Sequence, residues 1–180
     1  MKKTILSLTL VLATGLIFAQ KKTTTSASVS FDATTAIDAL PKADNKTVVA
    51  ALDTKAGSLA FEITIKNFAF SNPRIQEHFN AEGWMNSDKF PTATFKGDIT
   101  NLKAINFARD GKYSATVKGD ISIHGVTKPI EADGFIIVSG SKITATSEFK
   151  IKLEDFGVSG GAIAAGKVSK EPTISVLAEF

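Results

Sequence analysis

Apolar and polar residues alternate over long stretches of this chain, and a period of two residues is typical of β-strands that bury one face. In the clearest stretch, 113–123, every second residue is apolar or glycine, and the residues between them are polar or charged. The same alternation predicts strands at 29–31, 47–52, 59–66, 93–99, 130–138, 143–153 and 174–180. We therefore expect about eight β-strands.

One segment carries the signals of a helix instead. Asn72 can cap its start, and Pro73 suits the first helical position. Ile75 and Phe79 lie four residues apart, on one face, and the helix is expected to end near Gly83. Aromatic and apolar residues gather around this insert, where they either cap a tunnel or simply seat the helix: Phe68, Phe70, Phe79, Trp84 and Met85.

Many strands with short connections and a single helical insert predict an all-β fold, either an antiparallel β-barrel or a sandwich. We favour the barrel because closure removes the exposed strand edges that long alternating strands would otherwise present. The prediction is an antiparallel β-barrel of about eight strands with one short helical insert.

The inward faces of the predicted strands mix large residues such as Phe61 and Phe95 with small ones. The small residues are Ala93, Gly97, Ala115, Gly119, Ala132, Gly134, Ala145 and Ala178. An eight-stranded barrel lies at the margin where side chains either fill the interior or leave space for one ligand. Two interpretations stay open: the small residues leave a cavity, or they only permit strand bending around a filled core.

If the barrel is hollow, its wall is almost entirely hydrocarbon and would bind a long apolar chain. The candidate ligand-binding residues are Phe61, Ile63, Ile65, Phe68, Phe79, Trp84, Phe95, Ile99, Tyr113, Val117, Ile121, Ile123, Ile143, Phe149 and Ile151. A polar head group would project at the mouth of the barrel. His78, on the predicted helix, is the candidate for contacting it.

The first residues predict export. Lys2 and Lys3 precede an apolar run at 5–18, and Ala19 supplies a small residue at the expected cleavage site. The run is shorter than the roughly 20 residues of a membrane-spanning helix. We expect residues 1–19 to be a signal peptide and 20–180 to be one β-barrel domain, periplasmic or secreted, without an integral membrane span.

Composition narrows the candidate partners. The chain has no cysteine, so it has neither disulfides nor an acylated cysteine. Removing residues 1–19 takes away two lysines and lowers the formal charge from +3 to +1, which disfavours nucleic acid. The 13 Phe against one Trp and one Tyr favour an apolar ligand or core over a sugar-binding platform. A homodimer is left open.

No motif predicts a cofactor, metal or catalytic site. Residues 161–167 have phosphate-loop spacing, but Val168 follows where a Ser or Thr would bind magnesium, so a loop at the barrel rim is favoured. The two histidines, His78 and His124, have no cysteine partners and no paired-histidine spacing. His124, beside Gly125, is expected to order a turn.

Two longer segments suggest a family. Residues 87–95, Ser-Asp-Lys-Phe-Pro-Thr-Ala-Thr-Phe, and 119–129, Gly-Asp-Ile-Ser-Ile-His-Gly-Val-Thr-Lys-Pro, resemble the signature segments of the YceI-like polyisoprenoid-binding proteins. His-Phe-Asn at 78–80 and Asp-Phe-Gly-Val at 155–158 resemble lesser landmarks of that family. The family's Asp, His and Ser pattern is missing at 29–36, and Leu153 and Glu154 replace a basic residue. The resemblance implies a lipocalin-like barrel that holds a long isoprenoid, such as a quinone tail, in an apolar tunnel, and export to the periplasm.

Three functions remain to be compared. The first is a non-catalytic carrier or store for a polyisoprenoid or isoprenoid quinone-like lipid. The second is an enzyme that modifies such a lipid, with His78 and either Glu77 or Glu82 as acid and base. The third is a structural or adhesive exported domain with a filled core.

Overall fold

The computed structural model describes residues 21–180, which form one antiparallel sheet of nine strands. The predicted signal peptide, 1–19, lies outside these residues. The strands are β1 (Lys21–Asp32), β2 (Lys42–Asp53), β3 (Ser58–Thr64), β4 (Ala69–Phe70), β5 (Thr92–Ile99), β6 (Gly111–Ile123), β7 (Val126–Ser139), β8 (Lys142–Lys150) and β9 (Thr173–Glu179).

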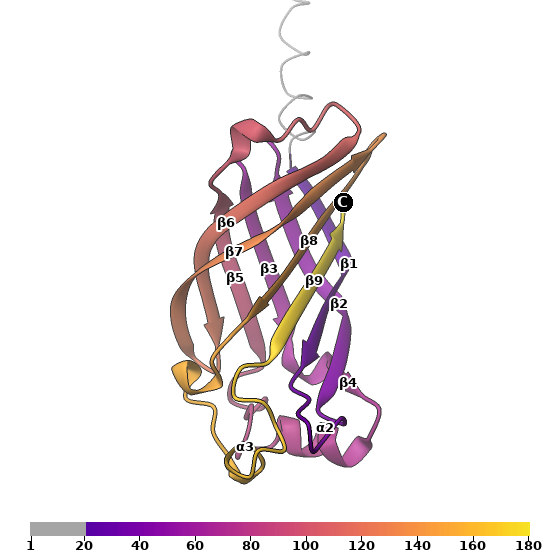
Figure 1. The fold of residues 1–180 in the computed structure, drawn as a ribbon. Helices are drawn as coiled ribbons and strands as arrows, with labels where there is room; N and C mark the ends of the chain where they lie inside the picture. The colour runs from indigo at the N-terminus through magenta and orange to yellow at the C-terminus, as the bar shows by residue number, and fades with distance from the viewer. Residues whose placement is uncertain (1–20) are drawn as a thin grey trace, which may run out of the picture.

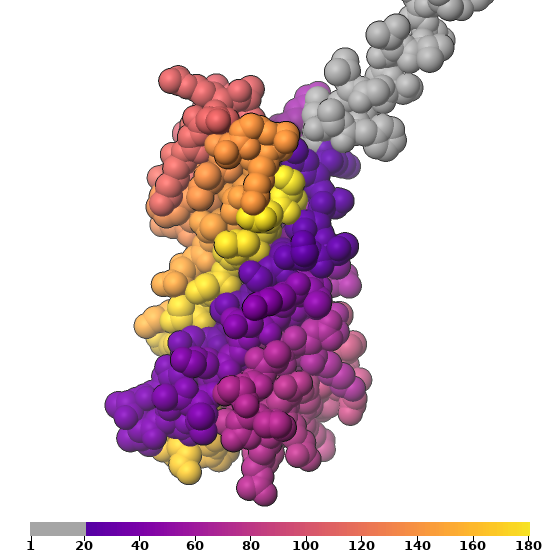
Figure 2. All heavy atoms as spheres, turned by 90° about the vertical axis from the view of Figure 1, so that its right-hand side faces the viewer, coloured from indigo at the N-terminus to yellow at the C-terminus, as the bar shows by residue number. Residues whose placement is uncertain are grey.

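The sheet closes on itself (Figure 1). The strand order is β1-β9-β8-β7-β6-β5-β3-β2-β4, and a further pairing of β1 with β2 joins the two sides. The two-residue β4 only extends the end of β2, where Phe70 pairs with Ala43. On one side of the molecule, β9 runs beside β1 (Figure 2). The predicted antiparallel barrel of eight long strands is confirmed.

Some strand boundaries differ from the prediction. β1 and β2 have 12 residues each and are longer than the predicted 29–31 and 47–52. Register shifts on either side of Ala27 interrupt the alternation, so the pattern did not reveal their full length. By contrast, β8 is shorter than predicted, because it ends at Lys150 and not at 153. Ile151 and Leu153 keep backbone hydrogen bonds to Pro172 and Lys170, so the apolar alternation continues past the strand.

The predicted helix is α2 (Pro73–Asn80), and its start is confirmed: the Asn72 side chain accepts a hydrogen bond from the Arg74 N–H. It ends at Asn80, before Gly83. Within residues 21–180, four shorter segments are also helical. They are η1 (Ile65–Asn67), η2 (Leu102–Ala104), η3 (Leu153–Phe156) and α3 (Gly161–Ala164), the last within the predicted rim loop. Ile65 therefore begins a turn of 3-10 helix instead of continuing β3.

Two separate hydrophobic cores close the two ends of the barrel. The helix-end core lies beside α2, and its centre is Phe31, Phe68, Phe70, Phe79 and Met85. The loop-end core lies beside η2 at the opposite end, and its centre is Leu52, Leu59, Ile99, Ile136 and Ile143. Between them, the middle of the barrel is left for the candidate site.

Candidate functional site

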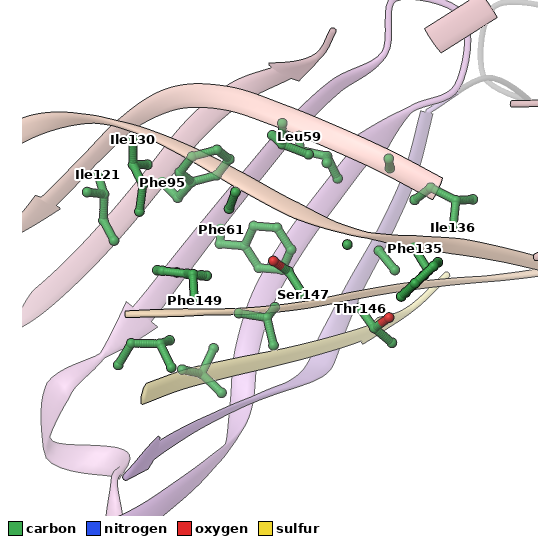
Figure 3. A pocket seen from close by; sticks show the side chains of 18 of the residues that line it. Leu59, Phe61, Phe95, Ile121, Ile130, Phe135, Ile136, Thr146, Ser147 and Phe149 are labelled. Carbon is green, nitrogen blue, oxygen red and sulfur yellow. The ribbon is translucent and has the colours of Figure 1, made fainter. Parts of the chain in front are cut away.

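A cavity occupies the middle of the barrel, between the two cores. Its volume is about 120 Å³ and it is partly open to solvent, so the space is narrow beside the roughly 300–1,000 Å³ of pockets that hold drug-sized ligands. Side chains of Phe61, Phe95 and Phe149 project into this space from β3, β5 and β8 (Figure 3). Further lining residues come from β1, β6, β7 and β9.

The inward-facing apolar side chains around this cavity are only partly buried. Phe61, Ile121 and Phe149 are half-buried, although they point into the barrel. In the helix-end core, by contrast, Phe79 is 2% exposed. A barrel whose middle was packed with side chains would bury both groups alike. The interior is therefore not filled at this level.

The small residues of the predicted inward face divide into three groups. Ala93 and Ala178 are buried in the helix-end core. Ala115, Ala132, Gly134 and Ala145 line the cavity, where they leave room. Gly97 and Gly119 do not line it but face each other across β5 and β6, and a side chain on Gly119 would overlap the Lys96 carbonyl oxygen. At those two positions glycine permits the strands to approach, and so it does at Gly134, where a side chain would overlap the Thr146 carbonyl oxygen. Each interpretation therefore holds for part of the set.

The structure brings some of the predicted ligand-binding residues together and separates the others. Those around the cavity are Phe61, Ile63, Phe95, Val117, Ile121 and Phe149. Those in or against the helix-end core that do not line the cavity are Ile65, Phe68, Phe79, Trp84, Ile123 and Ile151. Those in or against the loop-end core that do not line the cavity are Ile99, Tyr113 and Ile143. Alternation identifies the inward side of a strand but not the level of a residue along the barrel.

Nine lining residues are absent from the predicted set: Val29, Leu59, Ile130, Phe135, Ile136, Thr146, Ser147, Ile174 and Val176. Three of these nine depend on an interruption in the barrel wall. Phe135, Thr146 and Ser147 border the cavity, although Thr146 and Ser147 are neighbours that point to opposite faces of β8. The pairing of β7 with β8 begins only at Gly134 and Ser147.

Beyond that point the two strands separate (Figure 1). Among the described strands, residues 126–133 of β7 pair with β6 alone and residues 148–150 of β8 pair with β9 alone. We call this interruption the seam. The Ser147 hydroxyl donates a 2.7 Å hydrogen bond across it to the Asp133 carbonyl oxygen. The cavity reaches the molecular surface here, beside Phe135, which is 39% exposed.

The cavity wall offers little chemistry beyond hydrocarbon. Of the residues described, none with an ionisable side chain lines it, and the hydroxyls of Thr146 and Ser147 are its polar side-chain groups (Figure 3). Such a wall can select a ligand by length and shape.

The candidate polar residues of α2 lie away from the cavity. His78 is exposed and lines a separate shallow pocket with Trp84 and residues 159–163, and Glu77 and Glu82 are also exposed. In the part of the chain that the structure describes, no three His, Cys, Asp or Glu residues are grouped so that they could hold a metal ion. No helix within 21–180 is both long and apolar enough for a membrane span.

A sequence profile of the YceI-like domain matches residues 17–180, nearly the whole chain. The chain belongs to the YceI-like family. Solved structures share its fold. Burkholderia cenocepacia BcnA has 20% identity and a TM-score of 0.72, and the match covers 86% of this chain and 96% of that one. A polyisoprenoid binding domain from Saccharophagus degradans has 12% identity and a TM-score of 0.73, and the match covers 88% of this chain and 95% of that one.

Curated relatives match over shorter stretches. Protein YceI of Shigella flexneri is 31% identical over 88 residues, which are 46% of this chain and 42% of the relative. A UPF0312 protein of Vibrio cholerae is 25% identical over 109 residues, which are 57% and 54% of the two chains. The chain thus spans about half the length of these curated relatives.

The signature segments of this YceI-like domain meet at the helix end of the barrel. The ring of Phe90, from the first segment, lies 4.4 Å from that of His124, from the second, between centroids. A side chain on Gly125 would come within 2.6 Å of the Phe90 ring. His124 Nδ1 lies 3.2 Å from the carbonyl oxygen of Phe156, in the 155–158 landmark. His124 thus orders a turn, as expected, and ties the three segments together away from the cavity.

Proposed function

We propose that this YceI-like domain binds a long-chain apolar lipid, a polyisoprenoid or isoprenoid quinone-like molecule, with its chain in the mid-barrel cavity. We propose further that it acts as a non-catalytic carrier or store in the periplasm or outside the cell. The observation that carries the proposal is the partly open cavity, whose described wall is apolar except for the hydroxyls of Thr146 and Ser147.

The energetics of burial support an apolar ligand. Each buried methylene contributes about 0.8 kcal/mol, so ten of them contribute roughly 8 kcal/mol before the costs of ordering the ligand. The wall is formed by strands that the two end cores hold in place, so binding needs little reorganisation of the barrel.

Likeness and sequence supply further support. The Saccharophagus degradans domain with this fold is described as polyisoprenoid binding. The charged and apolar pattern of residues 1–19 favours export. Outside the cytoplasm, a lipid that leaves the membrane needs a protein to shield it from water.

Organic extraction of the purified mature protein, followed by mass spectrometry, tests the proposal. We expect a long-chain lipid to co-purify with the wild type and to be lost in Ala132→Phe, which fills the cavity from β7. The matched control is Ala60→Phe, which adds the same bulk to β3 at a position that does not line the cavity. Equal lipid content in both variants would contradict the proposal.

The enzymatic alternative makes a different prediction for the same sample. A carrier returns the lipid chemically unchanged after incubation, and His78→Ala retains it as the wild type does. Turnover of the lipid that disappears in His78→Ala would instead establish catalysis at α2.

A further inference from the structure

A groove lies on the outer surface of the barrel, beside the place where the cavity comes to the surface. The groove runs across β6, β7, β8, β9 and β1, and its volume is about 820 Å³. It shares with the cavity the lining residues Ala115, Gly134, Phe135, Thr146, Ser147 and Val176. Gly134 and Ser147, the last pair that joins β7 to β8, border both spaces, so the cavity and the groove lie on the two sides of the barrel wall at the seam.

Both ends of the barrel are closed, so a head group can reach water only through the side wall, at the seam. The helix-end core seals one end with Phe79, at 2% exposure, and the loop-end core seals the other with Leu52, at 1%. A lipid with its chain in the cavity therefore cannot extend along the barrel axis without displacing a core. Its polar end instead reaches water through the side wall, into the groove.

The groove has a distinct polar chemistry. Its hydroxyl-bearing residues are Ser28, Ser30, Ser114, Thr116, Thr146, Ser147 and Ser175. Its ionisable residues among those described are two carboxylates, Asp133 and Glu148. Thr116 Oγ1 donates to Asp133 Oδ1 at 2.7 Å, and Ser175 Oγ donates to Glu148 Oε2 at 3.2 Å. Each carboxylate has acceptor capacity beyond that one bond.

Basic side chains lie outside this lining. Lys112 is beside the rim, where its Nζ lies 3.8 Å from the centroid of the Phe135 ring. Phe135 and Leu177, which are 39% and 42% exposed, give the rim an apolar surface. The groove thus offers hydroxyls and negative charge to a ligand, while its neighbouring ammonium group is engaged by an aromatic face.

We propose that this groove is the head-group subsite, and that it accepts an uncharged head group that donates hydrogen bonds, such as a prenyl alcohol or a quinol, over a phosphate. The inference rests on the proposed function. Its reason is electrostatic: a phosphate would meet two carboxylates and no cation in the described lining, whereas a hydroxyl can donate to either carboxylate and accept from a serine.

Competition binding with geranylgeraniol and geranylgeranyl phosphate, presented on cyclodextrin at pH 7, tests this selectivity on the mature protein. We expect the alcohol to bind at least about tenfold more tightly than the phosphate. Glu148→Lys should bring the two affinities to within about threefold and make phosphate binding sensitive to salt. Glu148→Gln should narrow the difference less. The matched control is Glu62→Lys, which makes the same charge change on the outer face of β3 and should keep the wild-type ratio.

The outcomes separate the two proposals. Equal affinities in the wild type, a preference for the phosphate, or a ratio that neither Glu148 variant changes would overturn the head-group subsite while leaving chain binding in place. Failure of the wild type to bind either compound would overturn the proposed function itself.

Discussion

The cavity and the helix-end core are built from the same strands, yet one is hollow and the other is packed. Ile63 and Phe149 line the cavity, while Ile65 and Ile151, the next inward positions along the chain, lie in the core at 2% and 8% exposure. Residue type does not distinguish the two levels. What distinguishes them is the helix α2, whose Phe79 enters one level and is absent from the other.

The largest expected effect is in the packed region. Phe79 contacts the rings of Phe31, Phe68, Phe70 and Trp84, with centroids 4.9 to 5.8 Å away. Phe79→Ala should lower the free energy of unfolding by roughly 3–5 kcal/mol, because it leaves an empty space inside a close-packed cluster. Urea denaturation measures this loss. A loss below about 1 kcal/mol would show that the helix end is not a true core.

A smaller loss is expected where β5 and β6 approach each other. Gly119→Ala should destabilise the barrel by about 1–3 kcal/mol, since the added methyl would overlap the Lys96 carbonyl oxygen and force the strands apart. Gly83→Ala is the control, because a side chain there meets nothing within 4 Å. Thermal unfolding compares the two. If Gly119→Ala unfolds at the same temperature as the wild type, the glycine pair is not needed for the two strands to approach.

The cavity wall should tolerate truncation better than the core. Phe61 is half-buried and its ring contact is with Phe95, at 6.4 Å between centroids. Phe61→Ala should cost less than about 2 kcal/mol, because the side chain already borders empty space and loses few contacts. The same urea series measures this, and extraction should show a shift toward bulkier lipid chains. A loss as large as that of Phe79→Ala would mean that the middle of the barrel is packed as well.

The smallest expected effect is on the stability of the barrel at acidic pH, through Asp32. Hydrogen bonds from the Thr34 hydroxyl and then from the Thr34 N–H hold the pKa of Asp32 below its ordinary value. The stability that this ionised carboxylate contributes is present above the ordinary value and is lost as the pH falls through the lower, folded-state pKa. Asp32→Asn should therefore flatten the acid limb of the stability curve, by less than about 1 kcal/mol because the group is largely exposed. Urea denaturation between pH 2 and 7 measures the acid limb. An acid limb that is unchanged in Asp32→Asn would show that the ionised carboxylate does not stabilise the fold.

Much of the fold could be predicted because alternation is a local property. The inward faces of β3, β5 and β6 follow directly from residues such as Phe61, Phe95 and Val117, and Asn72 with Pro73 marks the start of α2. The longer alternating runs favoured closure of the sheet, because closure removes exposed strand edges.

The level of each residue along the barrel could not be predicted, because it depends on strand tilt and on how far each pair of strands stays joined. Ile65 and Ile151 continue the pattern of their neighbours and so were grouped with the cavity, although they belong to the core. Thr146 and Ser147 both reach the cavity because pairing between β7 and β8 stops at Ser147. A single-strand pattern carries no signal for that interruption.

The contact of Phe90 with His124, and of His124 with Phe156, fastens the chain at the helix end and touches no cavity-lining residue named in the wall. One part of each signature segment thus fastens the scaffold, while Phe95 and Ile121 of the same segments line the cavity. Substitutions at wall positions outside these segments, such as Ala132, can therefore reshape the cavity while the contacts of Phe90 and His124 stay in place.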